Sequence, residues 1–189
     1  MIRHRRRLTL VGVLISSAAL LMTACADHGP HTPASMDSSL TPEQSHDNVI
    51  DIFQAVKSVV GEGGWDEGTE FEWNDCSSNG EDGAQFTLTA IRKHPLLATP
   101  AVVTGRVAAA LKTSVGLDGA PVEHDDTLKP ARTVIAYPNG YNGGTSADGF
   151  GVEFQSGTDF ASLLVYGHCV PGKPPKLGTP LNPRPSDAP

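Results

Sequence analysis

The sequence predicts an α+β domain in which an antiparallel sheet of about five strands carries two helices on one face. Apolar residues recur at helical spacing between residues 49 and 60, and they alternate with polar residues between positions 150 and 155. The chain runs in the order helix, hairpin, helix and three strands, which is typical of two helices that cover one face of an antiparallel sheet.

The first helix is predicted to begin after Thr41. Thr41 and Gln44 form a capping-box pattern, and Pro42 occupies the first helical position. The apolar stripe that follows consists of Val49, Ile52, Phe53, Val56, Val59 and Val60. We expect this stripe to pack in the core, and Gly61 to begin the glycine-rich segment that ends the helix.

A hairpin is predicted next, with strands at residues 69–75 and 84–92 joined by the seven-residue loop SSNGEDG. Phe71 and Trp73 share one face of the first strand. The second helix is expected to begin at Thr99 and Pro100 and to stop at Gly116.

Three further strands are predicted at residues 132–137, 150–155 and 161–170. In the middle one, Phe150, Val152 and Phe154 alternate with glycine and polar residues. This pattern predicts a strand that is buried on one face and exposed on the other.

The segments outside residues 41–170 are expected to deliver and tether the domain. Residues 1–24 have the form of a signal peptide, with four arginines in the first seven residues and seventeen uncharged residues after them. An uncleaved transmembrane anchor is the weaker alternative, because about twenty apolar residues are needed to span a bilayer. Residues 25–40 are expected to form a flexible spacer, and residues 171–189, which contain seven prolines, a disordered tail.

Cys25 ends the apolar run, and Leu21-Met22-Thr23-Ala24-Cys25 resembles the lipobox of bacterial lipoproteins. This resemblance implies that Cys25 is diacylated at sulfur and becomes the new N-terminus after cleavage. Two or three acyl chains hold a protein at a membrane persistently, whereas one chain does so only marginally. A simple secreted protein remains the alternative to this lipid-anchored, extracytoplasmic form.

Cys76 and Cys169 are the two cysteines that remain once Cys25 is assigned to lipid. In an extracytoplasmic compartment an even pair of cysteines is expected to form a disulfide. One alternative is two free thiols, in which case His168 would influence the reactivity of the neighbouring Cys169 thiol. The other is that the two cysteines bind a metal ion, but the sequence supplies no second pair of ligands.

The charge of the mature chain restricts its partners. From Cys25 onward there are ten basic and 21 acidic residues, which gives a formal net charge of −11. Such a chain repels nucleic acids and anionic lipid headgroups, so we expect no nucleic-acid partner and expect membrane attachment through the lipid anchor alone.

Motifs for catalysis or metal binding are weak in this sequence. It contains no G-x-S-x-G motif, and the glycine-rich stretch at residues 139–146 lacks the lysine of a phosphate-binding loop. Residues 123–126, Glu-His-Asp-Asp, are adjacent and cannot all face one ion without help. Asp75, Glu81 and Asp82 lack the spacing of an EF-hand. We therefore predict no catalytic residue, no metal ligand and no cofactor.

The overall layout resembles the LppA-like lipoprotein family of mycobacteria and other actinobacteria. The similarity rests on the lipobox, the capped first helix, Trp73 shortly before Cys76, and Gly167-His168-Cys169 before a proline-rich end. The connection that contains residues 139–149 departs from this layout. The resemblance implies a cell-envelope location and a family without an established biochemical activity, so it supplies no functional residues.

These observations predict a noncatalytic, lipid-anchored envelope module that binds an envelope protein or a small ligand. The sheet face opposite the helices is the expected contact surface, marked by exposed aromatic residues. An envelope hydrolase or redox protein is the alternative, and it would require titratable side chains that converge in one pocket.

Overall fold

The computed structural model describes residues 39–66, 70–78, 80–118, 122–138 and 148–174. Its elements, in chain order, are α1 (Pro42–Val60), β1 (Glu70–Ser78), β2 (Glu81–Arg92), α2 (Pro100–Val115), β3 (Glu123–Asp125), β4 (Arg132–Tyr137), β5 (Gly151–Ser156), β6 (Ala161–Tyr166) and β7 (Val170–Pro171).

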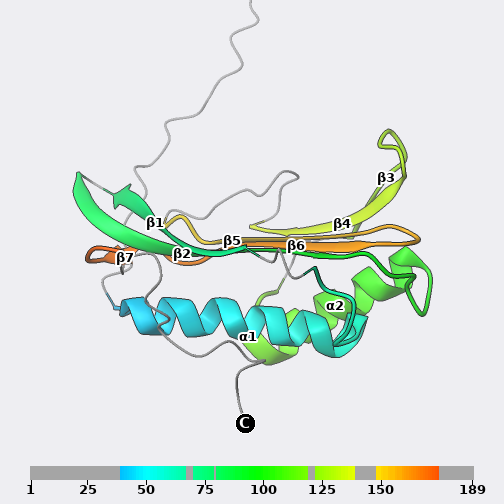
Figure 1. Cartoon of the computed structure of the whole chain (residues 1–189), viewed down its shortest axis with the longest axis horizontal. Coiled ribbons are helices and arrows are strands. Elements are labelled where there is room, and N and C mark those ends of the chain that lie inside the picture. The colour runs from blue at the N-terminus through cyan, green and yellow to red at the C-terminus, as the bar shows by residue number, and fades with distance from the viewer. Residues whose placement is uncertain (1–38, 67–69, 79, 119–121, 139–147, 175–189) are drawn as a thin grey trace, which may run out of the picture. The chain divides into compact units, whose positions relative to one another are not determined.

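The strands form one antiparallel sheet in the order β1-β2-β6-β5-β4-β3, and β7 pairs with β2 beyond the end of β6. Both helices lie on the same face of this sheet (Figure 1). The predicted α+β class with two helices on one face is confirmed. The two short strands β3 and β7 make the sheet larger than the five strands expected.

Helix α1 begins as its sequence predicts. The Thr41 side chain accepts a hydrogen bond from the backbone N–H of Gln44, and the Gln44 side chain accepts one from the backbone N–H of Thr41. Val49, Ile52 and Val56 are completely buried against the sheet. The apolar stripe of α1 therefore packs in the core, as its spacing predicts.

Helix α2 carries a buried polar contact as well as an apolar stripe. Val103, Val107 and Leu111 pack in the core. Between them, Thr104 is completely buried, and its hydroxyl lies 2.7 Å from the hydroxyl of the equally buried Ser156 on β5. The Ser156 hydroxyl also lies 3.2 Å from the carbonyl of Pro100, so both buried hydroxyl groups have hydrogen-bond partners.

The connection between β1 and β2 differs from the predicted seven-residue loop. The two strands stay paired up to Ser78 and Glu81, so only residues 79 and 80 join them. Gly80 has φ of +81°, a left-handed conformation that glycine adopts readily. Asn-Gly is a strong sequence signal for a two-residue connection of this kind, and it outweighs the polar residues on either side of it.

The predicted strand at residues 161–170 is also wrong, because a β-bulge divides it. Residue 87 on β2 pairs with residue 166, but residue 84 pairs with residue 170. Three residues, Gly167 to Cys169, therefore oppose two residues on β2. Beyond the bulge, Pro171 still pairs with Gly83, so the ordered sheet includes the first residue of the predicted tail.

Strand β5 is buried on both faces rather than on one. Val152 and Phe154 pack beneath the helices, as expected, but Glu153 on the opposite face is also buried. Glu153 accepts a hydrogen bond from the Gln155 side-chain amide, and the Gln155 carbonyl accepts one of 2.6 Å from Arg132. β5 is an interior strand of the sheet, and hydrogen bonds of this kind allow it to bury polar side chains.

Candidate functional site

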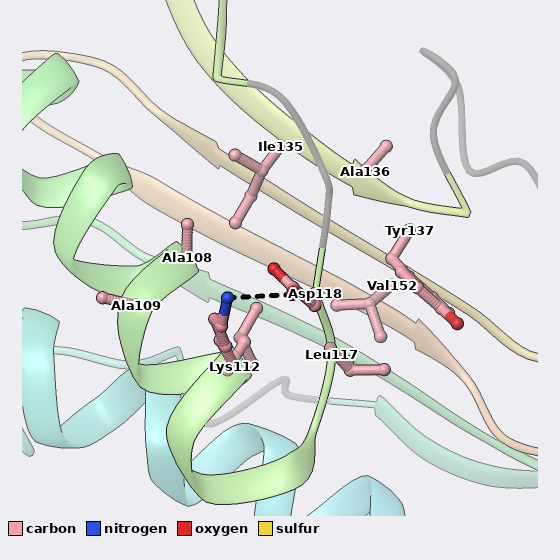
Figure 2. Close-up of a pocket in the computed structure, with 10 residues that line it drawn as sticks. Ala108, Ala109, Lys112, Leu117, Asp118, Ile135, Ala136, Tyr137 and Val152 are labelled. Atoms are coloured by element: carbon pink, nitrogen blue, oxygen red, sulfur yellow. Dashed lines mark hydrogen bonds and ion pairs between the residues drawn. The ribbon is translucent and has the colours of Figure 1, made fainter.

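A pocket of about 320 Å³ lies between the C-terminal half of α2 and the neighbouring strands β4 and β5 (Figure 2). It is lined by Ala108, Ala109, Leu111, Lys112, Leu117, Asp118, Ile135, Ala136, Tyr137 and Val152. Most of these side chains are apolar. The volume lies near the lower end of the range for small-molecule sites, which runs from about 300 to 1,000 Å³.

The short side chains of α2 explain why this space exists. Figure 2 shows Ala108 on α2 facing Ile135 on β4 across the pocket. Leu111, Ile135 and Val152 belong to the buried core and also line the pocket. The methyl group at position 108 leaves the space opposite Ile135 unfilled.

The turn after α2 forms one wall of the pocket. Gly116 adopts a left-handed conformation with φ of +73°, and the backbone N–H of Leu117 donates a 3.2 Å hydrogen bond to the carbonyl of Leu111. The backbone N–H of Gly116 donates a second bond of 3.2 Å to the carbonyl of Lys112, which is the 5→1 bond of an αL C-cap motif. This ending turns Leu117 and Asp118 back toward the strands.

The mouth of the pocket carries a solvent-exposed ion pair. Lys112 Nζ lies 2.8 Å from Asp118 Oδ2 (Figure 2), and both side chains are more than half exposed. An exposed pair of this kind contributes about 0 to 1 kcal/mol to stability, so a ligand displaces it at little cost. The pocket therefore combines apolar walls with a charged rim.

A second polar arrangement surrounds His168, the central residue of the bulge. Its Nδ1 hydrogen bonds to the Asp148 carboxylate, and its Nε2 lies 3.3 Å from the side-chain amide nitrogen of Asn48 on α1. The His168 ring also stacks on Phe150, with centroids 4.4 Å apart and planes 11° apart. Because an amide nitrogen can only donate, Nε2 accepts and Nδ1 carries the proton.

This arrangement ties α1 to the bulge. The Ser45 hydroxyl of α1 donates a 3.0 Å hydrogen bond to the backbone carbonyl of His168. A histidine oriented by a carboxylate is a component of many hydrolases, but it needs a nucleophile at its other nitrogen. Here the side-chain amide of Asn48 contacts that nitrogen. The nearby Ser45 hydroxyl donates its hydrogen bond to the backbone carbonyl of His168 instead.

The structure joins Cys76 and Cys169 in a disulfide, with their Cα atoms 6.1 Å apart. The bridge connects the end of β1 to the residue before β7, and both of these strands pair with β2. Cys169 therefore has no free thiol for His168 to influence. Cys25, the predicted site of lipidation, lies outside the described residues, as does the glycine-rich stretch 139–146.

The acidic cluster at residues 123–126 forms local contacts. His124 Nε2 lies 2.9 Å from Asp126, while Asp125 accepts hydrogen bonds from the backbone and hydroxyl of Thr127. Within the described part of the chain, no group of three or more His, Cys, Asp or Glu residues is placed to hold a metal ion. In the same residues, no helix is long and apolar enough to cross a membrane.

The aromatic residues of β1 lie on the face of the sheet that carries the helices, and not on the predicted contact surface. Phe71 and Trp73 of β1 pair with Leu88 and Phe86, which pack under the helices. They therefore lie on the helix-bearing face of the sheet. The opposite face carries polar residues such as Asn74, and it also carries the partly exposed Tyr166, which pairs with Thr87.

Comparisons with known proteins identify no family for this chain. No family model matches it, and no curated protein matches its sequence. Among solved structures, it is similar to a DUF4853 family protein from Actinomyces odontolyticus ATCC 17982. The two sequences are 16% identical, the alignment covers 75% of this chain and 71% of the other, and the TM-score is 0.40.

Proposed function

We propose that this protein is a lipid-anchored lipoprotein of the bacterial cell envelope whose extracytoplasmic domain binds a small, largely apolar ligand without transforming it. The pocket between α2, β4 and β5 is the observation that carries the ligand-binding part of this proposal. The location is supported by the basic N-terminus, the uncharged run and Cys25 in its lipobox context.

A noncatalytic function is favoured by the contacts of the described titratable groups. The pocket is lined by one lysine and one aspartate, which pair with each other. His168, whose Nδ1 bonds to the Asp148 carboxylate, has its second nitrogen beside Asn48. An envelope hydrolase, the alternative function, would need a nucleophile at that position.

The pocket is tested by filling it from α2. We expect Ala108→Leu to weaken binding of the uncharged fluorophore N-phenyl-1-naphthylamine at least tenfold, because the longer side chain occupies the space opposite Ile135. Ala101→Leu makes the same change at an exposed position of the same helix and serves as the matched control. Equal binding by the wild type and both variants would exclude the pocket as the site.

The lipid anchor is tested separately by radiolabelled palmitate incorporation in the producing bacterium. We expect the wild type to carry label and to fractionate with membranes, and Cys25→Ala to carry none. An unlabelled wild type would overturn the lipid-anchored part of the proposal while leaving the pocket experiment unaffected.

A further inference from the structure

Strand β1 forms a long edge of the sheet. It pairs with β2 over nine residues, from Glu70 to Ser78, and none of the described strands pairs with its other side. In an antiparallel strand, about every second residue directs its N–H and C=O away from the paired neighbour. β1 therefore offers a row of backbone donors and acceptors to another extended chain.

Aromatic side chains line the helix-bearing face of this edge. The Phe71 ring lies 6.1 Å from the Phe53 ring on α1, and the Trp73 ring lies 5.2 Å from the Phe86 ring on β2. Phe71 is 40% exposed, and Trp73 is partly exposed, whereas Phe53 and Phe86 are buried. Edge strands that avoid pairing with other chains usually carry charged residues or proline. Exposed aromatic side chains beside an edge strand instead indicate a surface that contacts a partner.

The same edge is strongly acidic. From the start of β1 to Ile91 of β2 the chain carries five acidic residues and no Lys or Arg, namely Glu70, Glu72, Asp75, Glu81 and Asp82. Glu62 and Asp66, which precede β1, pair with Lys57 and Lys93. Glu72 of β1 is exposed and lies on the face opposite Phe71, because side chains alternate along a strand. Asp75 adds a second exposed carboxylate to the strand.

This charge discriminates between the partners that could add a strand. A second copy of the chain would place its own acidic β1 against this one, and like charges directly opposite each other destabilise strand pairing. A basic segment would instead be attracted to the edge from a distance and held there by ion pairs.

We propose that β1 binds an extended segment of a partner protein in which basic and apolar residues alternate. The backbone of the segment pairs with the outer edge of β1 and extends the sheet. Its apolar side chains lie over Phe71 and Trp73, while its basic side chains on the other face pair with Glu72. This site is separate from the pocket between α2, β4 and β5.

The test uses the full-length protein in mild detergent and a synthetic seven-residue peptide of alternating lysine and valine. We expect binding that protects the β1 amides from hydrogen exchange and that weakens at least tenfold in Glu72→Lys. A peptide of alternating glutamate and valine is expected to bind at least tenfold more weakly than the lysine peptide to the wild type. Glu123→Lys, which makes the same charge change on the opposite edge strand β3, is expected to leave binding unchanged.

Two further measurements test the proposal without relying on the charge variants. Methylation of alternate backbone nitrogens of the lysine peptide is expected to abolish its binding to the wild type, because strand addition requires those N–H groups. Ala108→Leu is expected to leave peptide binding unchanged, which separates this site from the pocket.

Three results would overturn the proposal. The first is equal binding of the methylated and unmethylated peptides. The second is equal weakening by Glu72→Lys and Glu123→Lys, and the third is dimerisation of the protein through β1 itself.

Discussion

Loss of the Cys76–Cys169 disulfide is predicted to remove a large part of the stability of the domain. The two cysteines are separated by 93 positions in the sequence. In the chain-entropy account, closing a loop of this length stabilises the folded state by about 4 to 5 kcal/mol. Small domains have total unfolding free energies of about 5 to 15 kcal/mol, so the double variant Cys76→Ser, Cys169→Ser is expected to be marginally stable.

The position of the disulfide indicates which strand is destabilised most when the disulfide is lost. The disulfide links the end of edge strand β1 to the residue before β7, and β2 lies between these two strands. Without it, β1 is held by its pairing with β2 and by the contacts of Phe71 and Trp73. Hydrogen exchange of the β1 amides should therefore accelerate before that of β5 or β6.

Urea unfolding measures this prediction, with Cys25→Ala as the common background so that no third thiol interferes. We expect the double variant to lose about 4 to 5 kcal/mol of unfolding free energy relative to that background. Ser77→Ala, an exposed change beside Cys76, is the control and is expected to change stability by less than about 0.5 kcal/mol. A loss below about 1 kcal/mol in the double variant would refute the reasoning from loop closure.

Two further substitutions test how the sequence builds α1 and the bulge. Thr41→Ala removes the side-chain cap of α1 and is expected to cost about 1 kcal/mol in urea unfolding, whereas Thr99→Ala should cost clearly less, because Thr99 makes no side-chain cap bond at α2. Equal losses would contradict the assigned role of the capping box. Gly167→Ala would place its Cβ 2.7 Å from the carbonyl oxygen of residue 86, so we expect a loss of about 1 to 3 kcal/mol. Gly63→Ala, which meets nothing within 4 Å, is the control, and an unchanged melting temperature in both glycine variants would argue against the close packing at the bulge.

The sequence predicts most elements of the fold because their signals are local. The start of α1 follows from Thr41, Pro42 and Gln44, since a capping box satisfies backbone groups within one turn of the chain. The core faces of α1 and β5 follow from apolar spacing of about 3.6 and 2 residues. The pairing of Cys76 with Cys169 follows from the number of cysteines and the inferred compartment.

The features that concern function depend on contacts between distant segments. The pocket lies where Ala108 of α2 faces Ile135 of β4 and the short alanine side chain leaves the space unfilled. No local pattern reveals it, since an alanine in a helix is usually only a good helix former. Likewise, the bulge that presents His168 to α1 arises from the register between β2, β6 and β7.

The sequence by itself therefore determines the class of the fold, the bounds of both helices, the core faces of the main strands and the acidic charge of the chain. The tertiary structure decides the bulge, the pocket and the placement of Phe71 and Trp73 beside an edge that no described strand covers. The physical reason is that caps, turns and apolar periodicity act over a few neighbouring residues. Strand order, register and unfilled volume are set instead by side chains that meet only after the chain has folded.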